Sequence, residues 1–383
     1  MLTYPSKMRT RSGEADPYAT RPAERVERWD DTADVVVVGC GSAGASAAIE
    51  AREAGADVLV LERGSGLSGT TTLAGGVVYL GGGTRPQVAN GIDDTPEAMF
   101  DYLVANTPEP DEAKIRLYCE ESASHFDWLV DHGVPFNDEY YLGKHHMPEE
   151  PICLMYSGNE KAWPISERAR PAPRGHKAES EGEAGPVIVQ RLADTAERLG
   201  VRIEYDTQVT NLVLDEGGTV VGLRSVVFGE ERFARARRGV VLAAGAFSMN
   251  KEMVAEYCPS LAQHGVHRQG NPNDDGAAIL MGLAAGGRAI QMEKAFVTAP
   301  FYPPSSLIKG ILVNNNGERF INEDCYHART MDTAFRQPEG VAYLICDETT
   351  FGRPELGMQP LIDAWETIEE MERDLGLLDG SLQ

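Results

Sequence analysis

The sequence lacks three features, each of which would have indicated a particular class of protein. No apolar run approaches the ~20 residues of a transmembrane helix, and residues 1–31 contain no apolar core of a secretory signal. The six cysteines are scattered without C-x-x-C spacing, which argues against a zinc site or a disulfide framework. Acidic residues outnumber basic residues by 59 to 35, which argues against nucleic acid or an anionic membrane surface as a partner. We therefore predict a cytoplasmic protein whose cysteines are reduced thiols.

A buried strand followed by a glycine turn is the strongest signal that the sequence does contain. Four consecutive valines, residues 35–38, are apolar enough for the centre of a parallel sheet covered on both faces. In the G-x-G-x-x-G turn that follows, Gly39 makes the bend, Gly41 admits a pyrophosphate, and Gly44 lets the next helix pack closely. Glu62 ends the next apolar strand, where an acidic residue holds a ribose hydroxyl. This order predicts a dinucleotide at the helix N-terminus.

Two further segments favour FAD over NAD as the dinucleotide. Residues 63–76 form a loop of glycines and hydroxyl side chains, whose N–H and O–H donors suit a pyrophosphate and a ribityl chain. Far downstream, residues 239–246 predict another buried strand that ends in small residues, which lets the backbone approach a ligand. Strands at 201–207 and 209–213, with a hairpin partner at 220–227, are expected before it.

The order of these motifs resembles the flavoprotein superfamily of fumarate reductase, succinate dehydrogenase and the 3-ketosteroid dehydrogenases. The segments that carry the resemblance are 38–44, 62–63, 69–76, 241–245, 273–276 and 314–323. Within the superfamily, residues 75–84 are most similar to the 3-ketosteroid dehydrogenase branch. The resemblance implies an α/β fold: a Rossmann-like, glutathione-reductase-like FAD-binding domain with an inserted α+β cap or substrate domain.

The resemblance also implies the domain boundaries. We expect a polar N-terminal tail at 1–32, loose as far as residue 24, an FAD-binding domain at 33–287 and a cap domain at 288–383. The superfamily returns to the FAD domain near its C-terminus through a glycine-rich segment that meets the isoalloxazine ring. This chain stops at Gln383, just after a helix expected at 361–375. By that comparison we expect the C-terminal FAD segment, and any catalytic residue in it, to be absent.

The residues predicted to contact FAD come from the glycine turn, the second strand and its loop, the two downstream strands, and a turn whose acid resembles one near the flavin in the family. They are Gly39, Gly41, Ser42, Ala43, Gly44, Glu62, Arg63, Thr70, Thr71, Thr72, Gly75, Gly76, Val209, Ala244, Gly245 and Asp275.

The middle of the chain predicts helices followed by an irregular loop. Apolar periodicity favours two amphipathic helices, at 93–107 and 111–132. The stretch 138–185 is rich in proline, glycine and charge, and its aromatic residues suit either local packing or a lid over an apolar substrate. His145 and His146 point in different directions as neighbours and have no further ligand spacing, so we predict no metal site.

The candidate catalytic residues lie in the expected cap domain. An FAD enzyme of this kind moves a hydride between a substrate carbon and flavin N5, so a side chain must handle a proton on the neighbouring carbon. Tyr326 lies near the position of a catalytic cap tyrosine in the ketosteroid dehydrogenases, one residue out of register, and it would need a cation or second hydroxyl to ease phenolate formation. Arg329 resembles the proton-donating arginine of fumarate reductase, two positions out of register. Tyr302, in a proline-rich loop, suits either catalysis or packing.

Two elements of structure are expected around these residues. Arg319 and Glu323 are expected to form a structural ion pair. Residues 311–313 and 318–321 are expected to form a hairpin around the Asn-Gly turn at 315–317.

Three functions compete. The first is dehydrogenation of a flat apolar ketone, such as a 3-ketosteroid, with Tyr326 handling the proton and an external electron acceptor. The second is reduction of a small unsaturated acid with Arg329 as the proton donor. The third is a truncated FAD-binding fragment without activity of its own. The aromatic loops favour the first, which makes the chain an FAD-dependent dehydrogenase or reductase of CH–CH groups.

Overall fold

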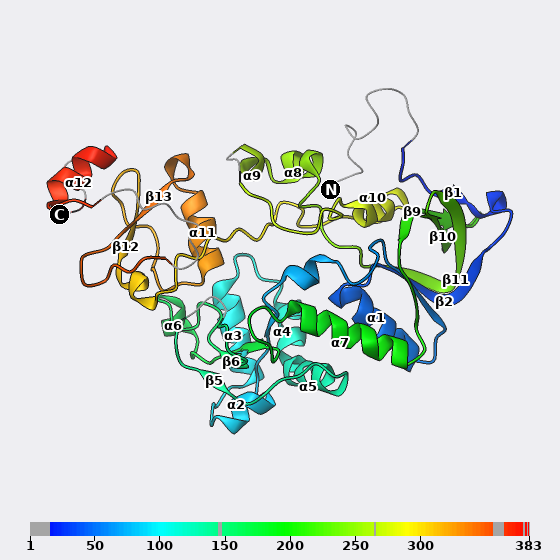
Figure 1. The fold of residues 1–383 in the computed structure, drawn as a ribbon, viewed down its shortest axis with the longest axis horizontal. Helices are drawn as coiled ribbons and strands as arrows, with labels where there is room; N and C mark the ends of the chain where they lie inside the picture. Colours follow the sequence, from blue (N-terminus) through cyan, green and yellow to red (C-terminus); the bar gives the residue numbers. More distant parts are fainter. Residues whose placement is uncertain are drawn as a thin grey trace. The chain divides into compact units, whose positions relative to one another are not determined.

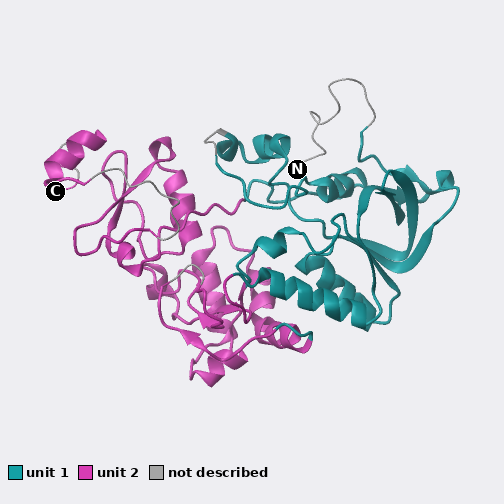
Figure 2. Cartoon of the chain, viewed as in Figure 1, with its two compact units in different colours: residues 1–76, 132–134, 183–294 teal, residues 77–131, 135–182, 295–383 magenta. Residues whose placement is uncertain are grey.

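The structure is a computed structural model that describes residues 16–144, 148–263, 266–354, 364–377, 380 and 382. The chain divides into two compact units, each built from separated stretches of sequence (Figure 2). Unit 1 contains residues 1–76, 132–134 and 183–294, and unit 2 contains residues 77–131, 135–182 and 295–383. In the part of the chain that is described, no helix has both the length and the apolar character needed to cross a bilayer.

Unit 1 is built on a seven-stranded sheet with the strand order β1-β9-β10-β11-β2-β3-β8. The strands are β1 (Arg21–Pro22), β2 (Asp31–Val38), β3 (Val58–Leu61), β8 (Arg202–Glu204), β9 (Thr207–Leu214), β10 (Val220–Val227) and β11 (Glu230–Leu242). The four strands β11, β2, β3 and β8 run parallel, whereas β9, β10 and β11 pair antiparallel. The valines of β2 and all of β3 lie at or near the core, as their apolar sequence predicted.

Helices pack against this sheet (Figure 1). Helix α1 (Ser42–Glu53) follows β2 directly and packs against β2, β3 and α7 (Gly185–Arg198). Helix α10 (Ala277–Ala284) packs against β9 and β11. The remaining helices of unit 1 are the short α8 (Lys251–Tyr257) and α9 (Pro259–Gln263) and the 3-10 turns η1 (Ala23–Arg25) and η2 (Thr70–Leu73).

Residues 16–24 are part of unit 1, which corrects the expectation of a loose tail for these residues, whereas residues 1–15 lie outside the described part of the chain. Strand β1 pairs parallel with β9. The side-chain amide of Asn211 in β9 donates to the carbonyls of Pro17 and Ala19, at 2.8 and 2.9 Å. The ring of Tyr18 packs against the apolar core under the sheet. These contacts satisfy backbone groups that a loose tail would leave to water.

Unit 2 begins with helices around a small sheet in the order β4-β7-β6-β5. Its strands are β4 (Val77–Tyr79), β5 (Tyr140–Tyr141), β6 (Leu154–Met155) and β7 (Gly175–Lys177), and its helices here are α2 (Arg85–Ala89), α3 (Pro96–Asn106), α4 (Glu112–Glu120), α5 (Ser122–Asp131) and α6 (Ile165–Arg168). Helix α3 begins as predicted, with Thr95 accepting from the N–H of Ala98. The helix predicted at 111–132 is broken in two at Glu121.

A buried polar network holds this part of unit 2 together. Arg174 and Asp94 form a bidentate ion pair, at 3.0 and 2.7 Å, and both side chains are fully buried. The carboxylate of Asp94 also accepts from the side chain of Gln87 and from the N–H of Gly82. His176, on the neighbouring strand, is bound to the hydroxyl of Thr84 at 2.8 Å. A connected buried network of this kind favours one arrangement of the core.

The rest of unit 2 contains the two-stranded sheet of β12 (Ile311–Asn314) and β13 (Ala342–Ile345) and the helices α11 (His327–Phe335) and α12 (Ile368–Leu375), with 3-10 turns η3 (Ser305–Lys309) and η4 (Pro338–Gly340). The hairpin expected after β12 is wrong. The Asn-Gly turn forms, but only one bridge, Val313 to Arg319, follows it, and β12 pairs with β13 instead. The ion pair expected between Arg319 and Glu323 does form, and Glu323 also accepts from the N–H of Leu312. Glu323 therefore occupies the edge of β12 that a hairpin partner would have used.

The two units divide the sequence differently from the predicted domains, because the segment 77–182 falls mainly in unit 2 together with residues 295–383. The boundaries 1–32, 33–287 and 288–383 stay a prediction.

Candidate functional site

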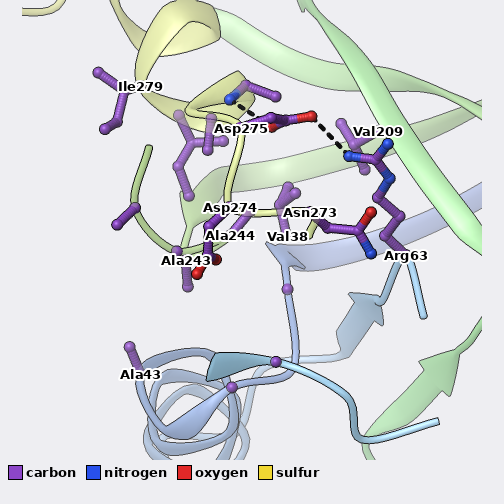
Figure 3. Close-up of a pocket in the computed structure, with 18 of the residues that line it drawn as sticks. Val38, Ala43, Arg63, Val209, Ala243, Ala244, Asn273, Asp274, Asp275 and Ile279 are labelled. Atoms are coloured by element: carbon purple, nitrogen blue, oxygen red, sulfur yellow. Dashed lines mark hydrogen bonds and ion pairs between the residues drawn. The ribbon is translucent and has the colours of Figure 1, made fainter. Parts of the chain in front are cut away.

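A cleft of unit 1 opens at the carboxyl ends of its parallel strands. It has a volume of about 950 Å³, which is at the upper end of ordinary ligand pockets of about 300–1,000 Å³. The ends of β2, β3 and β11, the turn before α1, the loop at 68–74 and helix α10 line it (Figure 3). Ligands of open α/β sheets bind at this end of the strands.

The glycine turn between β2 and α1 suits a diphosphate because its three glycines, Gly39, Gly41 and Gly44, carry no side chains. Gly39 has φ +95°, and a Cβ there would lie 2.7 Å from the carbonyl oxygen of Ala243. A Cβ on Gly44 would lie 1.9 Å from the carbonyl oxygen of Gly39, so only glycine lets α1 pack this close to the strand. Gly41 caps α1 without a side chain, and the N–H of Ser42 meets the hydroxyl of Thr71 at 3.1 Å. This donor set at a helix N-terminus fits a dinucleotide phosphate.

Glu62 lies at the end of β3, on the cleft, as the fingerprint predicted. Its carboxylate accepts from the N–H of Cys40 at 2.7 Å and from the N–H of Gly64 at 2.8 Å, and the residue is 9% exposed. A carboxylate has about four acceptor positions, so two remain for sugar hydroxyls. The thiol of Cys40 is not a candidate nucleophile, because burial raises its pKa to about 12.

The opposite wall joins two segments that are about 200 residues apart in sequence. The guanidinium of Arg63 forms an ion pair with Asp275 at 2.8 Å (Figure 3). The hydroxyl of Thr70 donates to Asp274, and the N–H of Asn271 donates back to that hydroxyl at 3.0 Å. Asp275 also caps α10 by accepting from Ala277. The loop after β3 and the turn before α10 therefore form one continuous wall.

Most of the predicted cofactor residues line this cleft: Gly39, Gly41, Ser42, Ala43, Glu62, Arg63, Thr70, Thr71, Val209, Ala244, Gly245 and Asp275. Four others do not line it, namely Gly44, Thr72, Gly75 and Gly76. Gly44 lies in the first turn of α1 and faces the carbonyl of Gly39, Thr72 donates to the carbonyl of Gly69, and a Cβ on Gly76 would meet Ala184. These four support the shape of the loop, and the contacts of all sixteen with a cofactor remain predictions.

Sequence reasoning did not select Asn271, Asn273 and Asp274, which also line the cleft. The polar turn before α10 was visible as a motif, but only Asp275 was carried over from the family pattern. The structure explains the omission for Asp274, since its carboxylate is placed by Thr70, a residue 204 positions away.

The candidate catalytic residues gather in unit 2. Tyr326 caps the N-terminus of α11, and its ring lies 4.2 Å from the ring of His327 and 6.3 Å from that of Phe296, centroid to centroid. Its backbone N–H donates to the side chain of Asn159 at 2.7 Å. Burial raises the pKa of Tyr326, and the carboxyl of Glu160 raises it further. Both causes favour the neutral phenol, in contrast to the cation that was expected to ease phenolate formation.

Tyr302 lies in an apolar cluster with Phe301, Leu307 and Leu312 and is 1% exposed. Burial raises the pKa of its phenol well above the ordinary value. The ammonium of Lys144 lies 5.4 Å from the centre of its ring. This environment favours the packing role for Tyr302 over the catalytic one.

Arg329 lies on the first turn of α11, and its guanidinium donates to the side-chain oxygen of Asn106 at 3.1 Å. The structure thus brings Tyr326, Tyr302 and Arg329 into one region of unit 2. His145 and His146 lie outside the described residues.

A buried carboxyl near Tyr326 was not predicted. Glu160 is 1% exposed, accepts from the phenol of Tyr79 at 3.0 Å and accepts from the N–H of Gly158 at 2.9 Å. Burial raises the pKa of this carboxyl. No motif marks it in the sequence, because a single glutamate in a polar loop reads as a solvated charge.

Comparison with known proteins places the chain in a family. The family model described as FAD binding domain matches residues 34–377. The chain is 30% identical to 3-oxo-5-alpha-steroid 4-dehydrogenase of Comamonas testosteroni over 84% of this chain and 68% of that protein. It is 28% identical to a fumarate reductase (cytochrome) of Shewanella frigidimarina, over 89% of this chain and 58% of that protein. The chain therefore spans about three fifths to two thirds of the length of these relatives.

A solved structure agrees with these matches. The crystal structure of 3-ketosteroid-delta4-(5alpha)-dehydrogenase from Rhodococcus jostii RHA1 in complex with 4-androstene-3,17-dione is 44% identical to this chain. It superposes with a TM-score of 0.89, covering 95% of this chain and 78% of that one. The predicted mixed α/β fold and the predicted cofactor, FAD, are confirmed. The chain belongs to the FAD binding domain family and is an FAD-dependent oxidoreductase of the CH–CH class, related to the 3-ketosteroid dehydrogenases and fumarate reductases.

Proposed function

We propose that the chain dehydrogenates a 3-ketosteroid at the CH–CH bond beside the ketone, with Tyr326 handling the proton. The observation that carries the substrate class is the 44% identity, over 95% of the chain, to a 3-ketosteroid dehydrogenase whose structure holds a steroid dione. The Comamonas relative is a 4-dehydrogenase of 3-oxo-5-alpha-steroids, and the Rhodococcus enzyme is a delta4-(5alpha)-dehydrogenase, so both names indicate position 4 of the steroid.

The chemistry divides between the cofactor and the chain. When bound, FAD supplies the acceptor for the hydride that leaves one of the two carbons. The other carbon, next to the ketone, loses a proton, and its C–H electron pair becomes part of the new double bond. We assign that proton to the phenolic oxygen of Tyr326. Because burial and Glu160 raise the pKa of this phenol, the base is a small phenolate fraction that grows with pH.

The irregular loop of unit 2 supplies apolar surface suited to such a substrate. Trp163 is 62% exposed, and Tyr140 and Tyr156 lie 6.4 Å apart, centroid to centroid. Rigid aromatic rings are suited to contact a flat apolar ligand with few polar groups.

A second candidate is reduction of a small unsaturated acid, as in the fumarate reductase relative. Arg329 is the observation that favours it, because it lies in α11, three residues after Tyr326, and a guanidinium binds a carboxylate through two parallel hydrogen bonds. Its bond to Asn106 already engages one of its donors.

Anaerobic flavin spectroscopy distinguishes these functions. We expect the purified chain to carry flavin absorbance that a 3-oxo-5α-steroid bleaches, whereas fumarate does not reoxidise the dithionite-reduced protein. Reoxidation by fumarate without bleaching by steroid would favour the second candidate. Flavin that responds to neither compound would leave a chain that binds FAD and has neither activity.

A further inference from the structure

The segment that contains Tyr326 is held in place by two side chains, Asn159 between β6 and α6 and Lys144 just after β5. Its backbone N–H donates to Oδ1 of Asn159 at 2.7 Å, and Asn159 is 3% exposed. Two residues before Tyr326, the carbonyl of Asp324 accepts from Nζ of Lys144 at 2.6 Å. The segment 324–326 is thus bound at both ends, by residues about 165 to 180 positions earlier in the chain.

The orientation of the Asn159 amide is fixed by its neighbours. Arg329 has only donors, so the atom of Asn106 that it meets at 3.1 Å is the oxygen. That same oxygen accepts from Asn159 at 2.9 Å, so the group of Asn159 that faces it is the NH₂. The oxygen of Asn159 consequently points to Tyr326. The N–H of Asn159 itself donates to the phenol of Tyr102 at 2.8 Å, which anchors the loop to α3.

Each polar group of the Asn159 side chain has a hydrogen-bond partner, so a small movement of the side chain breaks several bonds at once. Through Asn159, the network links Tyr102 of α3 to Tyr326, the N-cap residue of α11. The N–H of Tyr326 lies at a helix end, where the first N–H groups lack partners within the helix, so the oxygen of Asn159 supplies its hydrogen bond from outside the helix.

We propose that Asn159, assisted by Lys144, is a positioning residue for Tyr326. This inference rests on the proposed function, in which Tyr326 carries the proton. Asn159 sets the place of the Tyr326 backbone, and Lys144 sets the place of the residue two before it. Lys144 and Asn159, which lie on either side of β6 in the sequence, then act together as a template for the proton carrier.

The test compares Asn159→Leu with Asn314→Leu in the FAD-loaded chain. Asn314 is a matched control, because it is also 3% exposed, also lies in unit 2 and also makes amide hydrogen bonds, to Glu318 and Gln337. We expect Asn159→Leu to lower kcat by ~10- to 100-fold, the scale of a misplaced reacting group, with KM and FAD content little changed. In a Tyr326→Phe background the same substitution should have no further effect, since the two residues act together. An undiminished effect in that background would overturn the inference.

A second measurement does not depend on turnover. The chain is labelled with 3-fluorotyrosine, and the fluorine resonance of Tyr326 is identified as the one missing in Tyr326→Phe. We expect this resonance to shift in Asn159→Leu and in Lys144→Met but not in Asn314→Leu. An unmoved resonance in folded Asn159→Leu would overturn the inference, and Lys144→Met decides the question in the same way if Asn159→Leu does not fold. Normal turnover by Tyr326→Phe would instead overturn the proposed function, whatever the resonances show.

Discussion

The cofactor cleft of unit 1 and the tyrosine cluster of unit 2 are built in different ways. One wall of the cleft is made by residues close together in sequence, from β2 through the loop at 68–74, and the absence of side chains at Gly39 and Gly44 lets its backbone segments pack closely. Long-range bonds from Arg63 and Thr70 join this wall to the turn before α10. The cluster is made by side chains from positions 102–160 that hold a segment near 326. The glycine turn depends on backbone conformation, whereas the cluster depends on long-range hydrogen bonds. Substitutions should therefore affect the two sites in different ways.

The largest expected effect is on the cleft. Gly44→Ala places a Cβ 1.9 Å from the carbonyl oxygen of Gly39, so α1 must move away from the strand end. We expect nearly complete loss of bound flavin, measured as the flavin-to-protein absorbance ratio after gel filtration. Gly239→Ala, in β11 of the same sheet, is the control because its Cβ meets nothing within 4 Å. Equal flavin content in both variants would contradict the role of the glycine turn.

The next effect is on the cluster and should leave the cleft untouched. Tyr326→Phe removes the hydroxyl and is expected to lower kcat by ~10²- to 10⁴-fold, the usual range for general acid–base catalysis. Below the raised pKa of Tyr326, the wild-type rate should increase with pH, and the variant should lose this increase. Stopped-flow reduction of the bound flavin across a pH series measures both. A variant that keeps the pH dependence would assign the proton to another group.

Substitutions at the buried ion pair of unit 2 test whether lowering the stability of unit 2 also weakens FAD binding by unit 1. Arg174→Met leaves the carboxylate of Asp94 buried without its partner, which costs about 3–5 kcal/mol. Arg336→Met breaks an exposed pair with Asp332 and should cost less than about 1 kcal/mol. Urea unfolding followed by circular dichroism compares them. If the cleft of unit 1 does not depend on the core of unit 2, the FAD affinity measured below the unfolding transition is the same in both variants.

Acid should weaken unit 2 through His176. Burial lowers the pKa of this imidazole from its ordinary 6.5 to about 4. The unfolded chain therefore takes up a proton near pH 6.5 that the folded chain refuses until about pH 4, so stability is lost as the pH falls through this window. The full loss is about 3 kcal/mol at 1.36 kcal/mol per pKa unit. Urea midpoints at pH 7 and pH 4.5 should fall less in His176→Gln than in the wild type.

The smallest expected effect is on the ribose end of the cleft. Glu62→Gln replaces a carboxylate that accepts from Cys40 and Gly64 by an amide that can accept only through its oxygen. Losing a charge-assisted hydrogen bond costs about 1.5–3 kcal/mol, so the Kd for FAD should rise by ~10- to 100-fold. Glu204→Gln, at the end of the neighbouring strand β8, is the control. Fluorescence quenching of added FAD measures both constants.

The same contrast explains what the sequence could predict. Strand β2, the glycine turn, Glu62 and helix α3 were predictable because their signals lie within a few residues: an apolar run, glycines at fixed spacing, and a capping threonine before a proline. Their packing follows from local chemistry. The predicted hairpin after β12 was wrong although its Asn-Gly turn was predicted correctly. The side chain of Glu323 accepts the hydrogen bond from β12 that a partner strand would have accepted, and this contact has no local signal in the sequence.

The surroundings of Tyr326 could not be predicted. Asn159, Lys144 and Glu160 matter through partners that lie up to 180 positions away, and nothing in their own neighbourhoods distinguishes them from surface residues of a polar loop. The order of the first described residues was missed in the same way, because it depends on Asn211. Residues of this kind are found only when the fold has brought them together.

The most direct test of the account is the rate of anaerobic flavin reduction by a 3-oxo-5α-steroid, compared between the wild type and Tyr326→Phe at equal flavin content. The account predicts that both proteins hold FAD equally, while the variant is reduced at least about 100-fold more slowly. Equal rates of reduction, or loss of flavin from the variant, would contradict it.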